Sequence, residues 1–200
     1  MILFRSGLLI QLLTNFLNTD STDETDETDE HGFIHSNPTH PSKRPPGSLA
    51  GAEREAAALR WLARAAADLE TAAHSEMAGA VVRVLAQPEW AELFSPAALA
   101  EVPVTALVGD RVVAGTIDRL LVTPDVVRIV DFKTGRRPPS SLDEVPLAYL
   151  RQMAAYAAAL EVAYPGRRIE AALLFTQTPV LIEIPAEVIG VHKRDLSTGE

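Results

Sequence analysis

The chain has 200 residues, of which 47% are hydrophobic and 22% are charged, so it is long enough to bury the core of one domain. It contains no cysteine, which excludes disulfides, thiolate zinc sites, cysteine nucleophiles and cysteine-ligated iron–sulfur clusters. The formal charge is −9, but seven of the 27 acidic residues lie between Asp20 and Glu30, and the rest of the chain carries only −2. A nucleic-acid partner is therefore not excluded by charge.

Residues 1–48 are expected to lie outside the folded domain. The first 17 residues are apolar, but polar residues interrupt them and the run is too short to span a membrane. They also lack the cleavage pattern of a secretory signal, which favours a surface helix or a foreign segment on a cytoplasmic protein without membrane contact. The repeated TDE triplets of residues 20–30 and the proline-rich residues 31–48 predict a disordered segment and linker.

The domain itself is expected over residues 49–190, followed by a polar tail at 191–200. Its first part, from Leu49 to Ala86, predicts two helices, or one helix broken near Ala73 to Ser75. A meander of three antiparallel strands should follow, then a long helix to Tyr164 and two more strands. The predicted strands are 101–108, 111–122, 126–133, 168–177 and 180–185. This order gives an α+β, or mixed α/β, fold with one central mixed sheet flanked by helices.

Three short stretches carry the candidate chemistry: GTIDRL (115–120), DFKTG (131–135) and RQMAAY (151–156). Side chains alternate along a strand, so Asp131 and Lys133 should share one face. Asp118 can reach that face if its strand pairs with the next as a hairpin. Gln152 and Tyr156 share one helix face at i, i+4.

Two carboxylates and a lysine at one sheet edge fit metal-assisted phosphodiester hydrolysis. Carboxylates hold Mg²⁺ or Mn²⁺, and the ammonium stabilises or positions the attacking water. An acid-x-Lys triplet is common, and, considered alone, it is better explained by a plain salt bridge between Asp131 and Lys133. Asp118 and the Gln152/Tyr156 pair make the combination more specific.

Together with the stretches AEVPV, GTIDRLLV, VRIVDFKTGRRPP, VPLAYLRQMAAYAAALEVAYPGR and AALLFTQTP, the chain resembles the RecB-like nuclease domains of the PD-(D/E)XK superfamily, specifically the C-terminal domain of AddA helicase-nuclease subunits, with an unrelated or truncated N-terminus. The resemblance implies a restriction-endonuclease-like core. It further implies these roles: metal ligands Asp118, Asp131 and the Phe132 backbone carbonyl, catalytic lysine Lys133, and DNA-contacting or supporting residues Gln152 and Tyr156.

Other charged residues are weaker candidates. Arg119, Arg136 and Arg137 suit contacts to DNA phosphates, although a solvated basic loop explains them as well. Glu101 corresponds to an acid that some relatives place near the metal, or it is an exposed acid at a strand end.

Two features depart from the family. Its upstream histidine ligand is missing where residues 1–48 stand, and His74 is expected to be a packing or surface histidine. The chain has no GxxxxGK[ST] loop, so no ATP site is expected.

Two functional hypotheses follow. In the first, the chain is a Mg²⁺-dependent DNA exonuclease or endonuclease module for double-strand break repair, acting beside a helicase and a partner subunit. In the second, it is a truncated, catalytically impaired nuclease fold that binds DNA or a protein.

Overall fold

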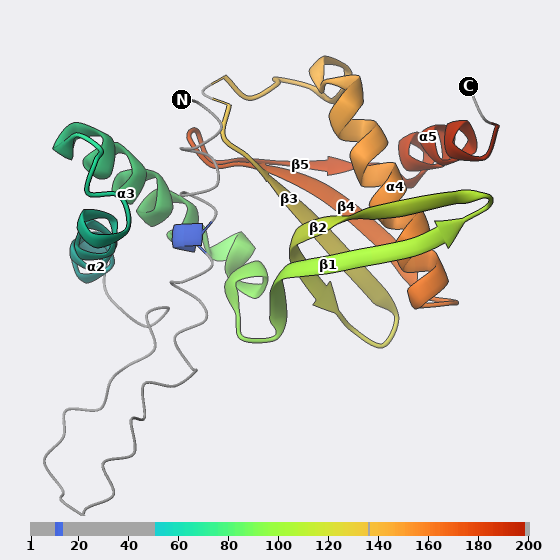
Figure 1. Cartoon of the computed structure of the whole chain (residues 1–200), viewed down its shortest axis with the longest axis horizontal. Coiled ribbons are helices and arrows are strands. Elements are labelled where there is room, and N and C mark those ends of the chain that lie inside the picture. The colour runs from blue at the N-terminus through green and yellow to red at the C-terminus, as the bar shows by residue number, and fades with distance from the viewer. Residues whose placement is uncertain (1–10, 14–50, 136, 199–200) are drawn as a thin grey trace, which may run out of the picture.

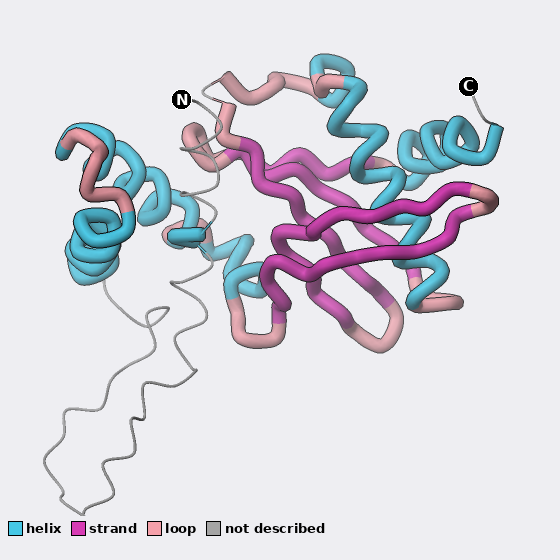
Figure 2. Tube along the Cα trace, in the orientation of Figure 1, coloured by secondary structure: helices cyan, strands magenta, loops and turns pink. Residues whose placement is uncertain are grey.

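The computed structural model describes residues 11–13, 51–135 and 137–198 (Figure 1). Its helices and strands follow the predicted order, and Figure 2 shows the strands gathered in one sheet. The elements are α2 (Gly51–Ala65), α3 (Thr71–Leu85), η2 (Pro88–Phe94), β1 (Ala98–Val108), β2 (Arg111–Val122), β3 (Val126–Lys133), η3 (Leu142–Glu144), α4 (Leu147–Ala163), β4 (Arg168–Phe175), β5 (Val180–Ile184) and α5 (Ala186–Thr198).

The five strands form one mixed sheet in the order β1-β2-β3-β4-β5. The pairs β1–β2, β2–β3 and β4–β5 are antiparallel, which confirms the predicted meander, and β3–β4 is parallel. Parallel neighbours need a crossover connection, and α4 supplies it. The predicted α+β fold with a mixed sheet is confirmed.

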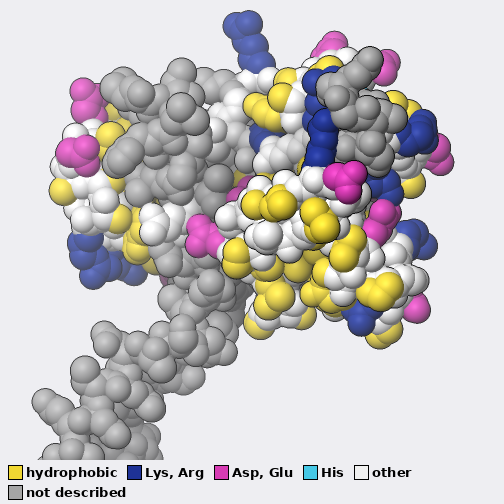
Figure 3. Space-filling view, turned by 45° about the vertical axis from the view of Figure 1, so that its right-hand side comes forward, with side chains coloured by type: hydrophobic (Ala, Val, Ile, Leu, Met, Phe, Trp, Pro, Cys, Tyr) yellow, Lys and Arg dark blue, Asp and Glu magenta, His cyan; other side chains and the backbone are white. Residues whose placement is uncertain are grey.

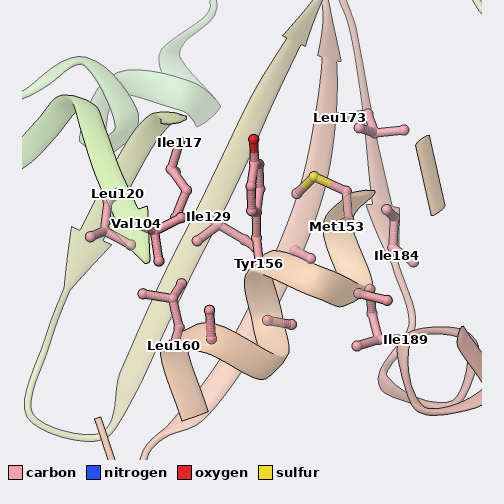
Figure 4. Close-up of a cluster of buried hydrophobic side chains, with 14 of the residues drawn as sticks. Val104, Ile117, Leu120, Ile129, Met153, Tyr156, Leu160, Leu173, Ile184 and Ile189 are labelled. Carbon is pink, nitrogen blue, oxygen red and sulfur yellow. The ribbon is translucent and has the colours of Figure 1, made fainter. Parts of the chain in front are cut away.

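The two faces of the sheet are covered by different helices. On one face, Val130, Phe132 and Leu174 are buried in a cluster with residues of α2, α3 and η2. On the other face, Ile129 and Leu173 pack against α4 in a second cluster, which Figure 4 shows. Strand β3 is therefore covered on both sides, and its alternating side chains serve two different layers.

Part of the N-terminal segment belongs to the first cluster. Most of residues 1–48, including the predicted disordered tract and linker, lies outside the described residues. Residues 11–13 are helical, and Leu12 and Leu13 are 0% exposed in the cluster with α2 and α3. These two leucines are thus core residues, because their apolar side chains fill space between the helices and the sheet.

Two boundaries differ from the sequence prediction. The helices α2 and α3 are separated at residues 66–70 instead of near Ala73 to Ser75, and the His74 ring Nε2 lies 2.8 Å from the Ala66 carbonyl oxygen across that turn. The polar tail predicted from residue 191 is instead the second half of α5. This helix packs on the domain through Ile189, which is buried in the second cluster, and through an ion pair between Lys193 and Glu161 of α4.

Candidate functional site

The sheet opens at Asp118. Pairing between β2 and β3 runs regularly as far as Arg119 opposite Val130 and then stops. Beyond this point the Asp118 Oδ2 atom accepts a hydrogen bond of 2.6 Å from the Phe132 backbone N–H, so a side chain takes the place of the next ladder partner. The sequence predicted that Asp118 could approach this face, and the structure brings it to β3.

A strained residue lies on the other side of Asp118. In the β1–β2 pairing, Ala100 faces Arg119 and Val102 faces Ile117, and Glu101 between them has φ of 50°. A positive φ is costly for a residue with a side chain, and such strain is often found at functional sites. Strand β2 thus departs from regular pairing with both neighbours at the same position.

The end of β3 carries a closed hydrogen-bond network. Lys133 Nζ lies 2.6 Å from Asp131 Oδ2 and donates to Gln152 Oε1 at 2.9 Å. Gln152 Nε2 donates to Asp131 Oδ1 at 2.9 Å and to the Tyr156 hydroxyl at 3.3 Å. The predicted alternation is confirmed, because Asp131 and Lys133 face α4 while Val130 and Phe132 are buried in the first cluster.

Tyr156 is held by β2 and depends on a glycine. Its hydroxyl donates to the Thr116 carbonyl oxygen at 3.1 Å. A Cβ atom at Gly115 would lie 2.6 Å from that hydroxyl and 2.7 Å from the ring carbon Cε1, which is too close for real atoms. The glycine in the GTIDRL stretch therefore makes room for the tyrosine that supports Gln152.

Burial raises the pKa values of both carboxyls. Burial, followed by the negative charge of Asp131, raises the pKa of Asp118 from 3.8 to about 7, and Glu101 adds to this effect. Burial raises the pKa of Asp131 as well, although the Lys133 ammonium opposes that increase. A cation other than Lys133 would favour the ionised forms of both groups.

The model of one protein family, described as PD-(D/E)XK nuclease superfamily, matches residues 31–194. The chain belongs to the PD-(D/E)XK nuclease superfamily. No curated protein matches the chain. One similar solved structure, "Crystal structure of SSO0001", has 15% identity and a TM-score of 0.32, with coverage of 100% of this chain and 88% of that one. This likeness is too weak to carry an argument.

PD-(D/E)XK nucleases typically use divalent metals such as Mg²⁺, and the residues present fit such an ion. Asp118 and Asp131 offer hard carboxylate oxygens whose ionised forms lack a full counter-charge. The N–H and C=O of one strand residue point to the same side, so the Phe132 carbonyl points toward Asp118, as its N–H does. Within the described ranges, no group of three or more His, Asp or Glu side chains could hold a metal.

The predicted DNA contact of Arg119 is corrected by the structure. Strand alternation turns its side chain away from Asp118, where it is 1% exposed, and Nε donates to the Leu93 carbonyl oxygen at 2.8 Å. The guanidinium lies over the Phe94 ring, and its two terminal nitrogens have no hydrogen-bond partner among the described residues. Burial lowers the pKa of Arg119 to about 10. An arginine in this position does not reach a phosphate.

The remaining candidates that the structure describes do not take part in the hydrogen-bond network above. Glu101 is exposed and lies between the β1 partners of Arg119 and Ile117, and its charge acts on Asp118. Arg137 is exposed on the loop after β3, and Arg136 lies outside the described residues. His74 is a buried packing histidine on α3, as predicted, on the sheet face opposite the network.

One residue of the site was not predicted from the sequence. The Tyr149 ring lies beneath the Lys133 ammonium, with 4.1 Å between Nζ and the ring centroid. The sequence signal that could have found it is helical spacing, because Tyr149, Gln152 and Tyr156 follow one another at intervals of three and four residues.

Proposed function

We propose that this chain is a metal-dependent DNA nuclease that hydrolyses phosphodiester bonds. The observation that carries the proposal is the convergence of Asp118, Asp131 and Lys133, with Gln152, at the point where β2 parts from β3. Superfamily membership supports the reaction class. The motif set supports the finer proposal: a RecB-like domain of AddA type that acts in the cytoplasm beside a helicase and a partner subunit in double-strand break repair.

Each residue has a role that its contacts support. Asp118, Asp131 and the Phe132 carbonyl would hold Mg²⁺ or Mn²⁺, which supplies positive charge against the phosphate and lowers the pKa of a bound water. Lys133 presents its ammonium beside Asp131, where it can stabilise charge on the phosphate or orient the attacking water. Gln152 binds both of these residues and fixes their relative position.

The decisive experiment measures cleavage by the full chain. Linear and circular DNA, single- and double-stranded, are incubated with Mg²⁺, Mn²⁺ or EDTA. We expect metal-dependent cleavage that Lys133→Ala abolishes and Lys193→Ala leaves unchanged, since Lys193 pairs with Glu161 in the α4–α5 contact. Cleavage that survives Lys133→Ala belongs to another nuclease and contradicts the proposal. Cleavage of circular DNA would establish endonuclease action.

Binding to DNA phosphates is tested separately through Arg137. A phosphate contact contributes about one unit to the dependence of log K on log salt concentration. Arg137→Ala should therefore weaken binding to all DNA sequences and reduce this slope by about 1, measured by fluorescence anisotropy between low and moderate salt. An unchanged slope would remove Arg137 from the DNA interface.

A second candidate function is a binding module without catalysis. The observation in its favour is an apolar face on the β1–β2 hairpin, where the cross-strand partners Leu107 and Val112 are 63% and 71% exposed. Figure 3 brings this side of the molecule forward and shows hydrophobic side chains at its surface. An exposed apolar pair of this kind offers a contact to a protein partner. Metal-independent DNA binding without cleavage under either metal would favour this candidate.

A further inference from the structure

The ring of Tyr149 contacts Lys133, but Tyr149 has no role in the proposed function described above. Tyr149 lies in the first turn of α4 and is half-buried. Its spacing to Gln152 and Tyr156 puts the three side chains in one stripe along the helix. The second and third members of this stripe bind the network by hydrogen bonds, and the first contacts Lys133 through its ring.

The Lys133 ammonium is enclosed on three sides. An ammonium group has three N–H donors, and two oxygen acceptors lie at 2.6 Å on Asp131 and 2.9 Å on Gln152. The Tyr149 ring covers a further side at 4.1 Å. As a result the side chain is only 11% exposed, although it stands at the end of a strand.

Hydrogen bonds alone do not fix a lysine well. The four-carbon stem is flexible, and the strongly hydrated ammonium gains by swinging toward water. An aromatic face within about 6 Å attracts the cation, and this attraction is stronger where water is excluded.

We propose that Tyr149 is a positioning residue whose ring holds the Lys133 ammonium against Asp131 and Gln152. The effect on cleavage rests on the proposed nuclease function, in which Lys133 acts on the phosphate or the attacking water. Tyr149 acts only through Lys133, and it acts through its ring, so phenylalanine can replace it and leucine cannot.

The kinetic test compares Tyr149→Phe with Tyr149→Leu. We expect kcat of the leucine variant to fall about ten- to thirtyfold, as loss of a well-desolvated cation–aromatic contact implies, with KM for DNA changed less than about threefold. The phenylalanine variant should stay within about twofold of the wild type. Tyr164→Leu is the matched control, because it removes a similar contact to Arg167 at the other end of α4, and it should cleave normally.

A second readout needs neither metal nor DNA. The chain has three lysines, Lys43, Lys133 and Lys193, so NMR of labelled lysine side chains gives a simple spectrum that Lys133→Met assigns. Tyr149 should shift the Lys133 side-chain protons upfield by its ring current. This shift should persist in Tyr149→Phe and vanish in Tyr149→Leu.

The outcomes separate the two proposals. An upfield shift that survives Tyr149→Leu, or wild-type kcat in that variant, overturns the role of Tyr149. Equal loss in the phenylalanine and leucine variants overturns the role of the ring. If the wild type does not cleave DNA at all, the proposed function fails, while the NMR comparison still decides whether Tyr149 holds Lys133.

Discussion

Replacing Asp118 by asparagine should stabilise the metal-free protein at pH 8. Asparagine keeps an oxygen that can accept the hydrogen bond from the Phe132 N–H, and it removes a charge that burial and Asp131 disfavour. The ionised Asp118 carboxylate therefore lowers the stability of the protein when no metal is bound. The difference in unfolding free energy between the variant and the wild type measures this effect.

The size and sign of the effect follow from the pKa of Asp118. It lies at about 7 in the folded chain against 3.8 ordinarily, and each pKa unit of difference is worth about 1.4 kcal/mol. The full difference would be about 4 kcal/mol, and the half-buried position of the side chain reduces our expectation to about 2 kcal/mol. Because the pKa is raised in the folded state, the free energy of unfolding of the wild type falls by this amount as the pH rises from about 4 to 7.

Urea unfolding in EDTA measures the prediction. At pH 8 the variant should be more stable than the wild type by about 2 kcal/mol, and near pH 4 the advantage should vanish. Asp110→Asn, at the exposed turn between β1 and β2, controls for the loss of one carboxylate. A variant equal to or less stable than the wild type at pH 8, or an advantage that persists at pH 4, would refute the reasoning. With Mg²⁺ the order should reverse if binding stabilises the wild type.

Three further predictions concern side-chain packing in the domain. Gly115→Ala should lower the free energy of unfolding by about 1–3 kcal/mol and reduce cleavage, because its Cβ overlaps Tyr156, and Gly115→Ala/Tyr156→Leu should lose less than the sum of the single changes. Arg119→Met should match or exceed wild-type stability and leave the salt dependence of DNA binding unchanged, since the guanidinium is buried and its terminal nitrogens have no hydrogen-bond partner in the described part of the chain; a reduced salt slope would contradict this. Leu12→Ala should cost about 2–5 kcal/mol in urea unfolding and the exposed Gln11→Ala almost nothing; equal losses would place Leu12 outside the core.

The strands were the most predictable part of the fold. The bounds of β2 and β3 agree with the prediction, because each apolar run ends at a clear turn signal. A short turn also required the two strands to pair antiparallel, and alternation placed Asp131 and Lys133 on one face. The convergence of the site residues thus follows from local rules, while their roles stay predictions.

The parts that sequence reasoning missed depend on contacts between distant segments. Arg119 follows Asp118 directly and was predicted to contact DNA phosphates. Alternation places the two on opposite faces, but only the position of η2 shows that Arg119 is buried. Leu12 and Leu13 were equally unpredictable, because the acidic tract separates them from the helices against which they pack.

The local costs of this fold meet at one point. Glu101 adopts a positive φ, Asp118 is half-buried beside another acid, and Gly115 has no side chain that would overlap Tyr156. Each feature is unfavourable for stability taken alone. Regular pairing continues along β1 and β2 on either side of this position, so the same strands could have avoided these costs. The interrupted pairing leaves a gap between β2 and β3, in which the Asp118 carboxylate faces β3 beside Asp131. A continuous ladder of backbone hydrogen bonds would close this gap.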